Sequence, residues 1–280
     1  MKEPLVHAAA KVIQTLPRER ISQIAGTLAD QVWPGWLGRR IVAAYQRAYN
    51  VDLQDCPERE WSSFDAFFKR ELRPGARPIA PGDDLAVSPA DGRLDEFGIV
   101  TPERTFLVKG RPYRVGELLG AESSATAYGG GAACVVYLSP RDYHRVHAPV
   151  GGRVRLVRSI AGDFFPVNEM GIRYVPELFV RNRRVTIELE TELADGVKAR
   201  VAVIMVVAMI VGRITVKSVR GNDVPVGEHF PNEIVNKGDE IGTFHLGSTA
   251  VVVFDRHWAG RWQAELGAIR LGDPLLRRRP

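Results

Sequence analysis

A serine that follows a glycine at the start of an apolar stretch is the residue with the most unusual chemistry open to it. Gly247-Ser248-Thr249 leads into the apolar residues 250–254. Glycine has no Cβ, so the backbone at Gly247 tolerates strain and a close approach of the Ser248 hydroxyl to the Gly247 carbonyl. Attack there would replace the amide by an ester. Elimination of that ester would leave dehydroalanine, which hydrolyses to a pyruvoyl group and ammonia. The same tripeptide also fits an ordinary strand start or turn.

Two histidines and one aspartate could activate this serine, which is a weak nucleophile until a base takes its proton. His144 and His147 lie in the polar segment 137–149, between two apolar runs. Imidazole titrates near neutral pH and suits general-base work. Asp91, in an Asp-Gly step, could orient an imidazole, so the pattern predicts a triad of Asp91, His147 and Ser248. The structural alternatives are a hydrogen-bonding histidine and an aspartate that only forms a turn.

Helices are expected in the first part of the chain. Apolar residues recur near helical spacing between Ile13 and Leu28, and further helices are expected over 37–45 and around 61–68. Ser62 or Ser63 could cap the last of these.

The residue pattern changes after a turn-rich connector at 73–78. Short β-branched runs then alternate with Gly, Pro and Asp-Gly turns, which is typical of a mostly-β domain. The expected strands are Leu85–Val87, Cys134–Leu138, Val154–Val157, Val185–Leu189, Val201–Val211, Arg213–Val219 and Thr249–Phe254. The sequence therefore predicts an α+β protein, with a helical, basic, membrane-surface segment at 1–73 and a β-rich catalytic domain at 74–280.

Two segments of the β-rich part resemble the halves of a barrel-sandwich fold of the biotinyl or lipoyl carrier kind. His147–Val154 is similar to its first strand and turn, and Val235–Phe244 is similar to its returning strand. The hairpin lysine that such carriers modify has no counterpart here. The resemblance therefore concerns topology and does not indicate carrier function.

Composition excludes several classes of protein. With 45% hydrophobic and 25% charged residues, the 280-residue chain is neither collagen-like, nor low-complexity, nor a polytopic membrane protein. The longest apolar run, Val201–Val211, is too short to cross a bilayer as a helix, which takes roughly 20 residues. The two cysteines, Cys56 and Cys134, fit a reducing compartment better than a disulfide framework.

Positive charge is concentrated near the N-terminus. The formal net charge is +5, and residues 1–47 carry seven basic side chains against three acidic ones. Trp33 and Trp36 stand beside Arg39 and Arg40, a combination that suits an anionic membrane surface. The alternatives are a solvated basic face and tryptophans that pack against the main domain. The net charge is too small to indicate nucleic acid as a partner.

Together with further motifs, these residues resemble the phosphatidylserine decarboxylase family, pyruvoyl-dependent enzymes made as self-cleaving proenzymes. The most specific matches are the loop with both histidines and the Leu-Gly-Ser-Thr step. The matching segments are Phe67–Pro74, Ser88–Gly92, Val108–Gly110 with Tyr113 and Leu118–Leu119, Tyr137–Pro149, Phe165–Asn168, Asn182–Arg184 and Leu246–Thr249.

The resemblance implies a role for the predicted triad in self-processing. Cleavage would fall between Gly247 and Ser248, giving a β chain of residues 1–247 and an α chain of residues 248–280. The two chains would stay together as a heterodimer, with a higher oligomer left open.

The resemblance also implies the reaction. The pyruvoyl group derived from Ser248 would form a Schiff base with phosphatidylserine, release CO2 and give phosphatidylethanolamine, without a metal. His144 would act in decarboxylation, by proton transfer or substrate positioning. The expected location is the cytoplasmic side of a bacterial inner (plasma) membrane, held peripherally.

One other reading is a zinc-dependent peptidase on a similar β scaffold. A catalytic zinc usually has three protein ligands, which His144, His147 and Asp91 could supply. The His-x-His and His-x-x-x-Asp patterns of such enzymes are missing, and zinc analysis would discriminate between the two functions.

Overall fold

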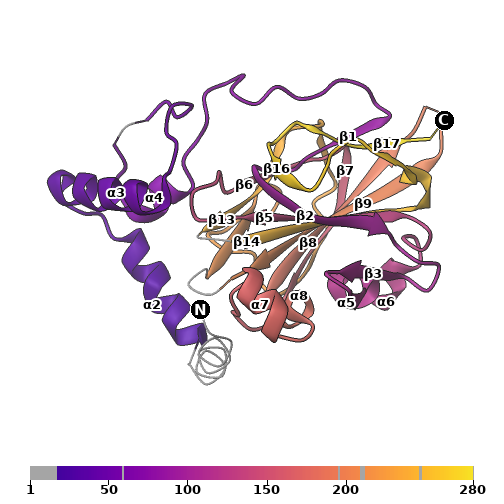
Figure 1. The fold of residues 1–280 in the computed structure, drawn as a ribbon, viewed down its shortest axis with the longest axis horizontal. Helices are drawn as coiled ribbons and strands as arrows, with labels where there is room; N and C mark the ends of the chain where they lie inside the picture. The colour runs from indigo at the N-terminus through magenta and orange to yellow at the C-terminus, as the bar shows by residue number, and fades with distance from the viewer. Residues whose placement is uncertain (1–17, 59, 195, 209–211, 246–247, 280) are drawn as a thin grey trace.

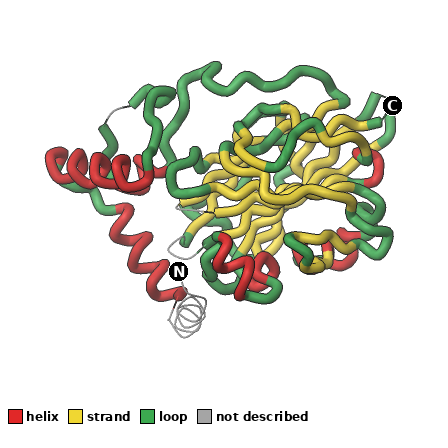
Figure 2. Tube along the Cα trace, viewed as in Figure 1, coloured by secondary structure: helices red, strands yellow, loops and turns green. Residues whose placement is uncertain are grey.

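The N-terminal helices form one side of the molecule, and strands with several short helices form the rest (Figure 1). The computed structural model describes residues 18–58, 60–194, 196–208, 212–245 and 248–279. The longer helices are α2 (Arg18–Asp30) and α3 (Gly35–Tyr49), followed by the short α4 (Phe64–Phe68). Figure 2 shows a long loop that leaves this helical side and arches over the strands. The expected mostly-β α+β class is confirmed.

Local sequence signals set the ends of these helices. Asn50 adopts a left-handed conformation (φ 53°) after α3, and its N–H binds the Gln46 carbonyl. Ser63 accepts a hydrogen bond from the Ala66 N–H at 3.1 Å and so caps α4, as expected. The part of the first expected helix that precedes Arg18 lies outside the described residues.

The largest sheet has nine strands among the described residues, all paired antiparallel. Their order is β11 (Gly227–His229), β7 (Gly152–Ile160), β8 (Arg184–Glu192), β9 (Lys198–Val207), β14 (Ser248–Phe254), β5 (Ala132–Leu138), β2 (Gly92–Ile99) and β16 (Gly267–Ile269), and β12 (Glu233–Val235) also pairs with β7. This order has two ends, so the sheet is open.

Smaller sheets and helices surround this sheet. One sheet joins β1 (Leu85–Val87), β17 (Pro274–Arg278) and β15 (Gly260–Trp262), and another joins β10 (Arg213–Val216), β13 (Glu240–His245) and β6 (Arg145–His147). The remaining elements are β3 (Thr105–Val108) paired with β4 (Arg111–Arg114), the helices α5 (Val115–Leu119), α6 (Glu122–Ala125), α7 (Glu169–Tyr174) and α8 (Leu178–Arg181), and the 3₁₀ helix η1 (Arg256–Trp258).

Strand β14 is the most deeply enclosed element. All seven of its residues are buried, and they pair on one side with β5 and on the other with β9, from Ser248↔Leu138 and Ser248↔Val207 to Phe254. A strand buried on both faces requires apolar residues on both, which explains the continuous run in place of an alternating one. Its first residue is thereby held at one end of the sheet.

Two expected strands differ in length from the prediction. The strand expected over Arg213–Val219 ends at Val216, because the chain turns back there and Val219 bridges to Val216. Strand β9 ends at Val207, and the rest of the run predicted to Val211 lies partly outside the described residues, at 209–211.

The two segments that resemble barrel-sandwich halves lie side by side. His147 pairs with Glu240 between β6 and β13, and Gly152 pairs with Val235 between β7 and β12. Between these pairs, the Ala148 N–H binds the Asp239 carbonyl at 2.8 Å.

The helical side is attached to the body close to the histidine loop. Phe68 lies in the main core, and the Tyr45 hydroxyl donates to the Pro140 carbonyl at 3.2 Å. Arg70, directly after α4, donates to the carbonyls of Arg141 and Asp142 at 2.8 and 3.0 Å. The conformation of loop 139–144 therefore depends on residues from the N-terminal part.

No helix among the described residues has both the length and the apolar character needed to span a membrane.

The enclosure of β14 predicts a large effect of truncating its last side chain. Phe254 is fully buried beside Trp258 and Trp262, so Phe254→Ala should lower the free energy of unfolding by about 3–5 kcal/mol through lost burial and a new cavity. The matched control is Ile99→Ala, at a side chain 74% exposed, which should change it by less than about 0.5 kcal/mol. Urea titration followed by circular dichroism measures both. Equal effects would contradict the placement of β14.

Candidate functional site

Ser248 lies in an environment that leaves its hydroxyl without a partner. It is the first residue of β14 and 1% exposed, and its Oγ makes no hydrogen bond within the described part of the chain. A buried hydroxyl without a partner costs free energy, and such groups often mark sites of chemistry. Gly247, the other half of the predicted cleavage site, lies outside the described residues.

His144 is completely buried at the end of the loop that follows β5. Its Nδ1–H donates to the Asp142 carbonyl at 2.8 Å, and its ring lies 4.1 Å from that of Phe68. Nε2 therefore carries a lone pair, and it has no hydrogen-bond partner among the described residues. Burial, followed by the positive charge of Arg70, lowers the pKa of His144 to about 3. The imidazole is thus neutral at physiological pH.

His147 lies three residues further, on β6, and both of its ring nitrogens are engaged. Nδ1–H donates to the Gly238 carbonyl at 2.9 Å, so Nε2 accepts from the Tyr143 hydroxyl at 3.2 Å. Burial lowers the pKa of His147, against the opposing effects of the Gly238 hydrogen bond and of more distant carboxylates, Asp91 among them. His147 is therefore also a neutral imidazole with a basic Nε2.

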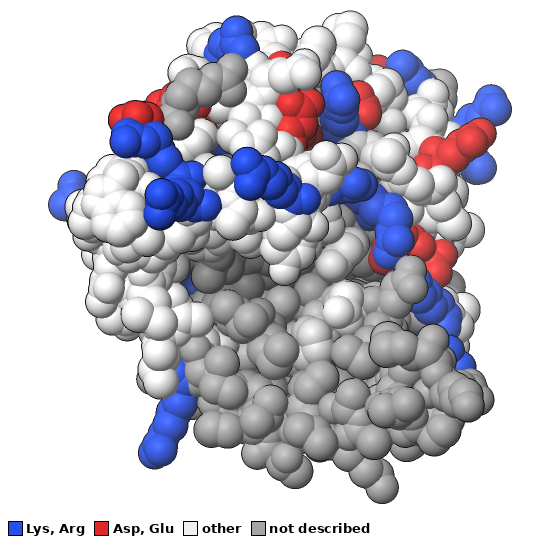
Figure 3. Space-filling view, turned by 60° about the vertical axis from the view of Figure 1, so that its left-hand side comes forward, with Lys and Arg blue, Asp and Glu red and all other residues white. Residues whose placement is uncertain are grey.

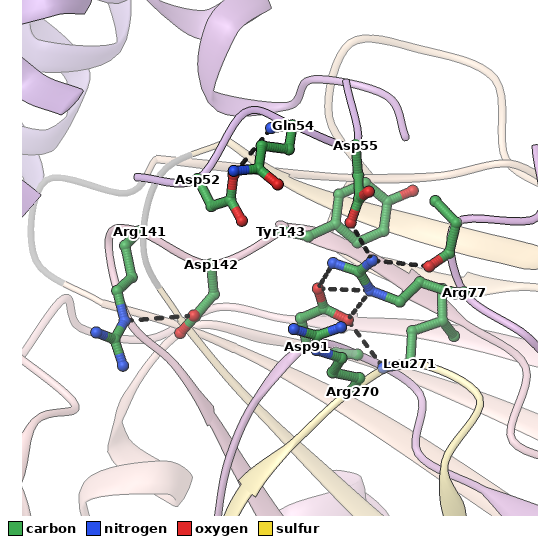
Figure 4. A network of polar contacts seen from close by, with 12 residues as sticks. Asp52, Gln54, Asp55, Arg77, Asp91, Arg141, Asp142, Tyr143, Arg270 and Leu271 are labelled. Carbon is green, nitrogen blue, oxygen red and sulfur yellow. Dashed lines mark hydrogen bonds and ion pairs between the residues drawn. The ribbon is translucent and has the colours of Figure 1, made fainter. Parts of the chain in front are cut away.

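Asp91 is bound by a guanidinium and a backbone amide (Figure 4). Arg77 donates to the Asp91 carboxylate through Nε at 3.0 Å and Nη2 at 2.6 Å, and it also reaches Asp55 at 2.7 Å. The Leu271 N–H donates to the same carboxylate at 2.9 Å. Asp91 and Tyr143 both line a cavity of about 290 Å³.

The structure brings the predicted residues to one region but does not hydrogen-bond them to one another. The His147 N–H binds the Pro89 carbonyl at 2.8 Å, which places the turn that carries Asp91 beside β6. Ser248 pairs with Leu138, the last residue before the histidine loop, and the His144 carbonyl accepts from the Phe244 N–H at 2.9 Å. Within the described residues, the polar atoms of Asp91, His147 and Ser248 bind other groups or none.

Sequence reasoning missed two side chains that shape the site. Arg70 binds the Asp142 carbonyl, the same acceptor as His144, and its charge adds to the effect of burial in lowering the pKa of that imidazole. Tyr143 occupies Nε2 of His147. Arg70 lies in the family-like Phe67–Pro74 segment, and Tyr143 stands between the histidines. Arg70 and Tyr143 both lie within motifs that the sequence analysis singled out, but no spacing rule relates either residue to Ser248.

The arrangement gives no support to the zinc peptidase reading. No cluster of three or more His, Cys, Asp or Glu side chains suited to a metal occurs in the described ranges. His144 and His147 direct Nδ1 to different backbone carbonyls, of Asp142 and Gly238.

Several known proteins similar to this chain share one description. The profile of a family described as phosphatidylserine decarboxylase matches residues 64–276. A phosphatidylserine decarboxylase proenzyme of Anaeromyxobacter sp. (strain K) is 36% identical over 275 residues, which cover 94% of this chain and 95% of that protein. Proteins described by the same words are 36% identical in Psychrobacter arcticus, over 94% of this chain and 95% of its own length, and 35% identical in Myxococcus xanthus, over 95% and 96%.

The neutrality of His144 predicts a pH dependence of stability. Its ordinary pKa of 6.5 applies in the unfolded chain and a pKa of about 3 in the folded one, so between these values only the unfolded chain binds the proton. Stability should be complete above pH 6.5 and fall as the pH drops, by at most about 1.4 kcal/mol per pH unit for this group. His144→Gln should flatten the slope in urea titrations, whereas His229→Gln, at a partly exposed histidine, should keep it. An unchanged slope in His144→Gln would contradict the buried neutral imidazole.

Proposed function

We infer, because this chain belongs to the phosphatidylserine decarboxylase family, that it is made as a proenzyme and matures into an enzyme that converts phosphatidylserine to phosphatidylethanolamine and CO2. The observation that carries this proposal is the buried, unpartnered Ser248 hydroxyl at the start of β14. Backbone pairing with two neighbouring strands fixes the position of Ser248, and its hydroxyl is already desolvated before it reacts.

The proposed maturation starts with an acyl shift. Ser248 Oγ attacks the Gly247 carbonyl carbon, the C–N bond breaks, and the proton of the hydroxyl ends on the freed Ser248 nitrogen. A base then removes the Ser248 α-proton, and the Cβ–O bond of the ester breaks. Gly247 leaves as the new carboxyl terminus of the β chain. Water hydrolyses the dehydroalanine that remains, which releases ammonia and leaves a pyruvoyl group at the head of the α chain.

We propose His147 as the base for the attack and Asp91 as its electrostatic support. Because Nδ1–H is fixed on Gly238, the basic lone pair of His147 is on Nε2. That atom accepts from Tyr143, so it must exchange this hydroxyl for that of Ser248 during the reaction. The Asp91 carboxylate raises the pKa of His147, which favours the imidazolium that proton uptake produces.

His144 is the residue we propose for the decarboxylation step. The pyruvoyl group, once formed, supplies a carbonyl that condenses with the substrate amine and accepts the electron pair left by CO2. Nε2 of His144 is buried, unprotonated and unpartnered among the described residues, so it fits a group that positions the substrate by accepting a hydrogen bond. The apolar contact with Phe68 keeps water from this face of the ring.

Strand pairing supports an α chain that stays with the β chain after cleavage. Strand β14 is enclosed by β5 and β9, and β17 and β16, also in the α chain, pair with β1 and β2 of the β chain. These contacts do not involve the scissile bond. The mature enzyme is therefore proposed as an α/β heterodimer.

We further propose that the helical side rests on an anionic membrane surface. Exposed apolar side chains follow α2 and the start of α3: Ile24, Leu28, Val32 and Trp36 are 53–77% exposed. Figure 3 shows Lys and Arg side chains in a row across the described part of this face. Arg40 stacks on Trp36 at 5.7 Å, and Arg39 is exposed nearby. Exposed apolar groups on a face that also carries basic side chains suit the headgroup layer.

From this surface we propose how the chain is divided into two parts and where the protein is located in the cell. Residues 1–73 would form the membrane-contacting segment and residues 74–280 the catalytic domain, with barrel-sandwich topology where β6 and β7 meet β13 and β12. The protein would be peripheral, on the cytoplasmic face of a bacterial inner membrane.

The maturation proposal is tested by the chain pattern of purified protein. Wild type should give two bands on a denaturing gel and release CO2 from phosphatidylserine vesicles, while Ser248→Ala should stay one chain without activity. Ser159→Ala, at another buried serine of the same sheet, should behave as wild type. A wild-type protein that is active and unbroken would overturn the proposal.

The membrane proposal is tested by sedimentation with phosphatidylglycerol-containing vesicles. Val32→Ser with Trp36→Ser should weaken binding at least about tenfold, since each burial in lipid is worth about 1.5–3 kcal/mol. Ile99→Ser, at an exposed apolar side chain on β2, should not. A vesicle affinity that changes neither with the double substitution nor with the removal of anionic lipid would contradict the assigned surface.

A further inference from the structure

A buried imidazole–carboxylate pair lies next to the cleavage segment and has no role in the mechanism above. His245 Nδ1–H donates to Asp65 Oδ1 at 2.7 Å, and the two side chains are 8% and 6% exposed. The other ring nitrogen, Nε2, lies 3.3 Å from the Thr215 hydroxyl. His245 is thus fixed through both nitrogens, by residues 180 and 30 positions away in the chain.

The pair joins three parts of the fold. Asp65 belongs to α4, Thr215 to β10, and His245 is the last residue of β13. The backbone of His245 also pairs with that of Arg213, and this is the terminal residue pair between β10 and β13. His245 is therefore the last described residue before Ser248, and among the described residues its side chain is the last anchor upstream of the scissile bond.

Cationic groups next to Asp65 favour its ionised form. Burial would raise the pKa of Asp65, but the hydrogen bond and charge of His245, with those of Lys69 at 2.8 Å, lower it to about 2. Arg213 lies 3.7 Å from the same carboxylate and 2.5 Å from Asp30 of α2. The acceptor of His245 is consequently charged throughout the physiological range.

We propose that His245, held by Asp65 and Thr215, is a positioning residue for self-cleavage. It fixes the upstream end of the segment, while the pairing of β14 fixes the downstream end. The described residues on both sides of the proposed cleavage site are thereby fixed in position. A displacement of about 1 Å in such a reaction can cost as much as about 10²-fold in rate. The inference rests on the proposed self-cleavage.

The test follows cleavage of freshly made chain in cell-free translation, sampled over time on denaturing gels. His245→Ala and Asp65→Ala should slow the appearance of two chains by roughly 10- to 100-fold. Hydroxylamine, which cuts esters and leaves amides intact, should not cut the uncleaved chain, because the block precedes the acyl shift. His257→Gln, at the partly exposed histidine paired with Asp255 beyond the other end of β14, should cleave as wild type.

Conservative substitutions separate positioning from general damage to the fold. Asp65→Asn keeps an oxygen that can accept from Nδ1–H, so it should recover most of the wild-type rate. Joining Asp65→Ala to His245→Ala should slow cleavage no further than His245→Ala alone, since both remove one interaction. The same variants in Ser248→Ala background, which stay one chain, report folding through thermal unfolding. If His245→Ala does not fold in the Ser248→Ala background, two other measurements test the positioning role. The cleavage rate of Asp65→Asn should exceed that of Asp65→Ala, and Thr215→Val should cleave more slowly than wild type.

The outcomes distinguish this inference from the function on which it rests. A folded His245→Ala chain that cleaves at the wild-type rate would overturn the inference and leave the proposed function intact, as would additive effects of the two alanine substitutions. A wild-type chain that never cleaves would overturn the proposed function and the positioning role together.

Discussion

The enclosure of β14 between β5 and β9 is the constraint on which the rest of this molecule depends. Seven consecutive residues are buried and paired on both sides, so Ser248 is fixed at one end of the strand independently of the residues that precede it. A backbone break at that point removes one covalent bond but none of the pairing. The same arrangement explains how a precursor can hold its nucleophile rigidly and how the two products of cleavage can remain one folded protein.

Burial also determines the chemistry open to the two histidines of the loop. An imidazole without access to water resists protonation, and the charge of Arg70 adds to that effect at His144. Each ring is oriented by an Nδ1–H bond to a backbone carbonyl, which leaves Nε2 as the basic atom. Both histidines are thus neutral in the resting state, with the lone pair on Nε2. The backbone carbonyls that orient them come from segments that sequence patterns mark only as turns.

The sequence predicted the elements better than the contacts between them. The apolar run after Ser248, the capping Ser63 and the β-rich texture after the connector depend on neighbouring residues, and local rules suffice for these. Local rules do not suffice for hydrogen bonds between Asp91, His147 and Ser248, which depend on distant residues. In this structure, Arg77 and the Leu271 N–H bind the Asp91 carboxylate. Arg70 and the Asp65–His245 pair escaped notice because their partners lie 72 and 180 residues away. Contacts between residues so far apart in the chain depend on how the helices pack on the sheet, which a single sequence does not reveal.

The proposed mechanism requires that Ser248 be converted into a carbonyl group at a new N-terminus. The most direct measurement is the intact mass of the small chain separated from active protein under denaturing conditions. It should equal the mass of residues 248–280 less one molecule of ammonia, and treatment with phosphatidylserine and a borohydride reductant should add the reduced lipid adduct to that chain. A small chain with an unmodified serine at its head, or active protein whose only chain is 280 residues long, would contradict the account.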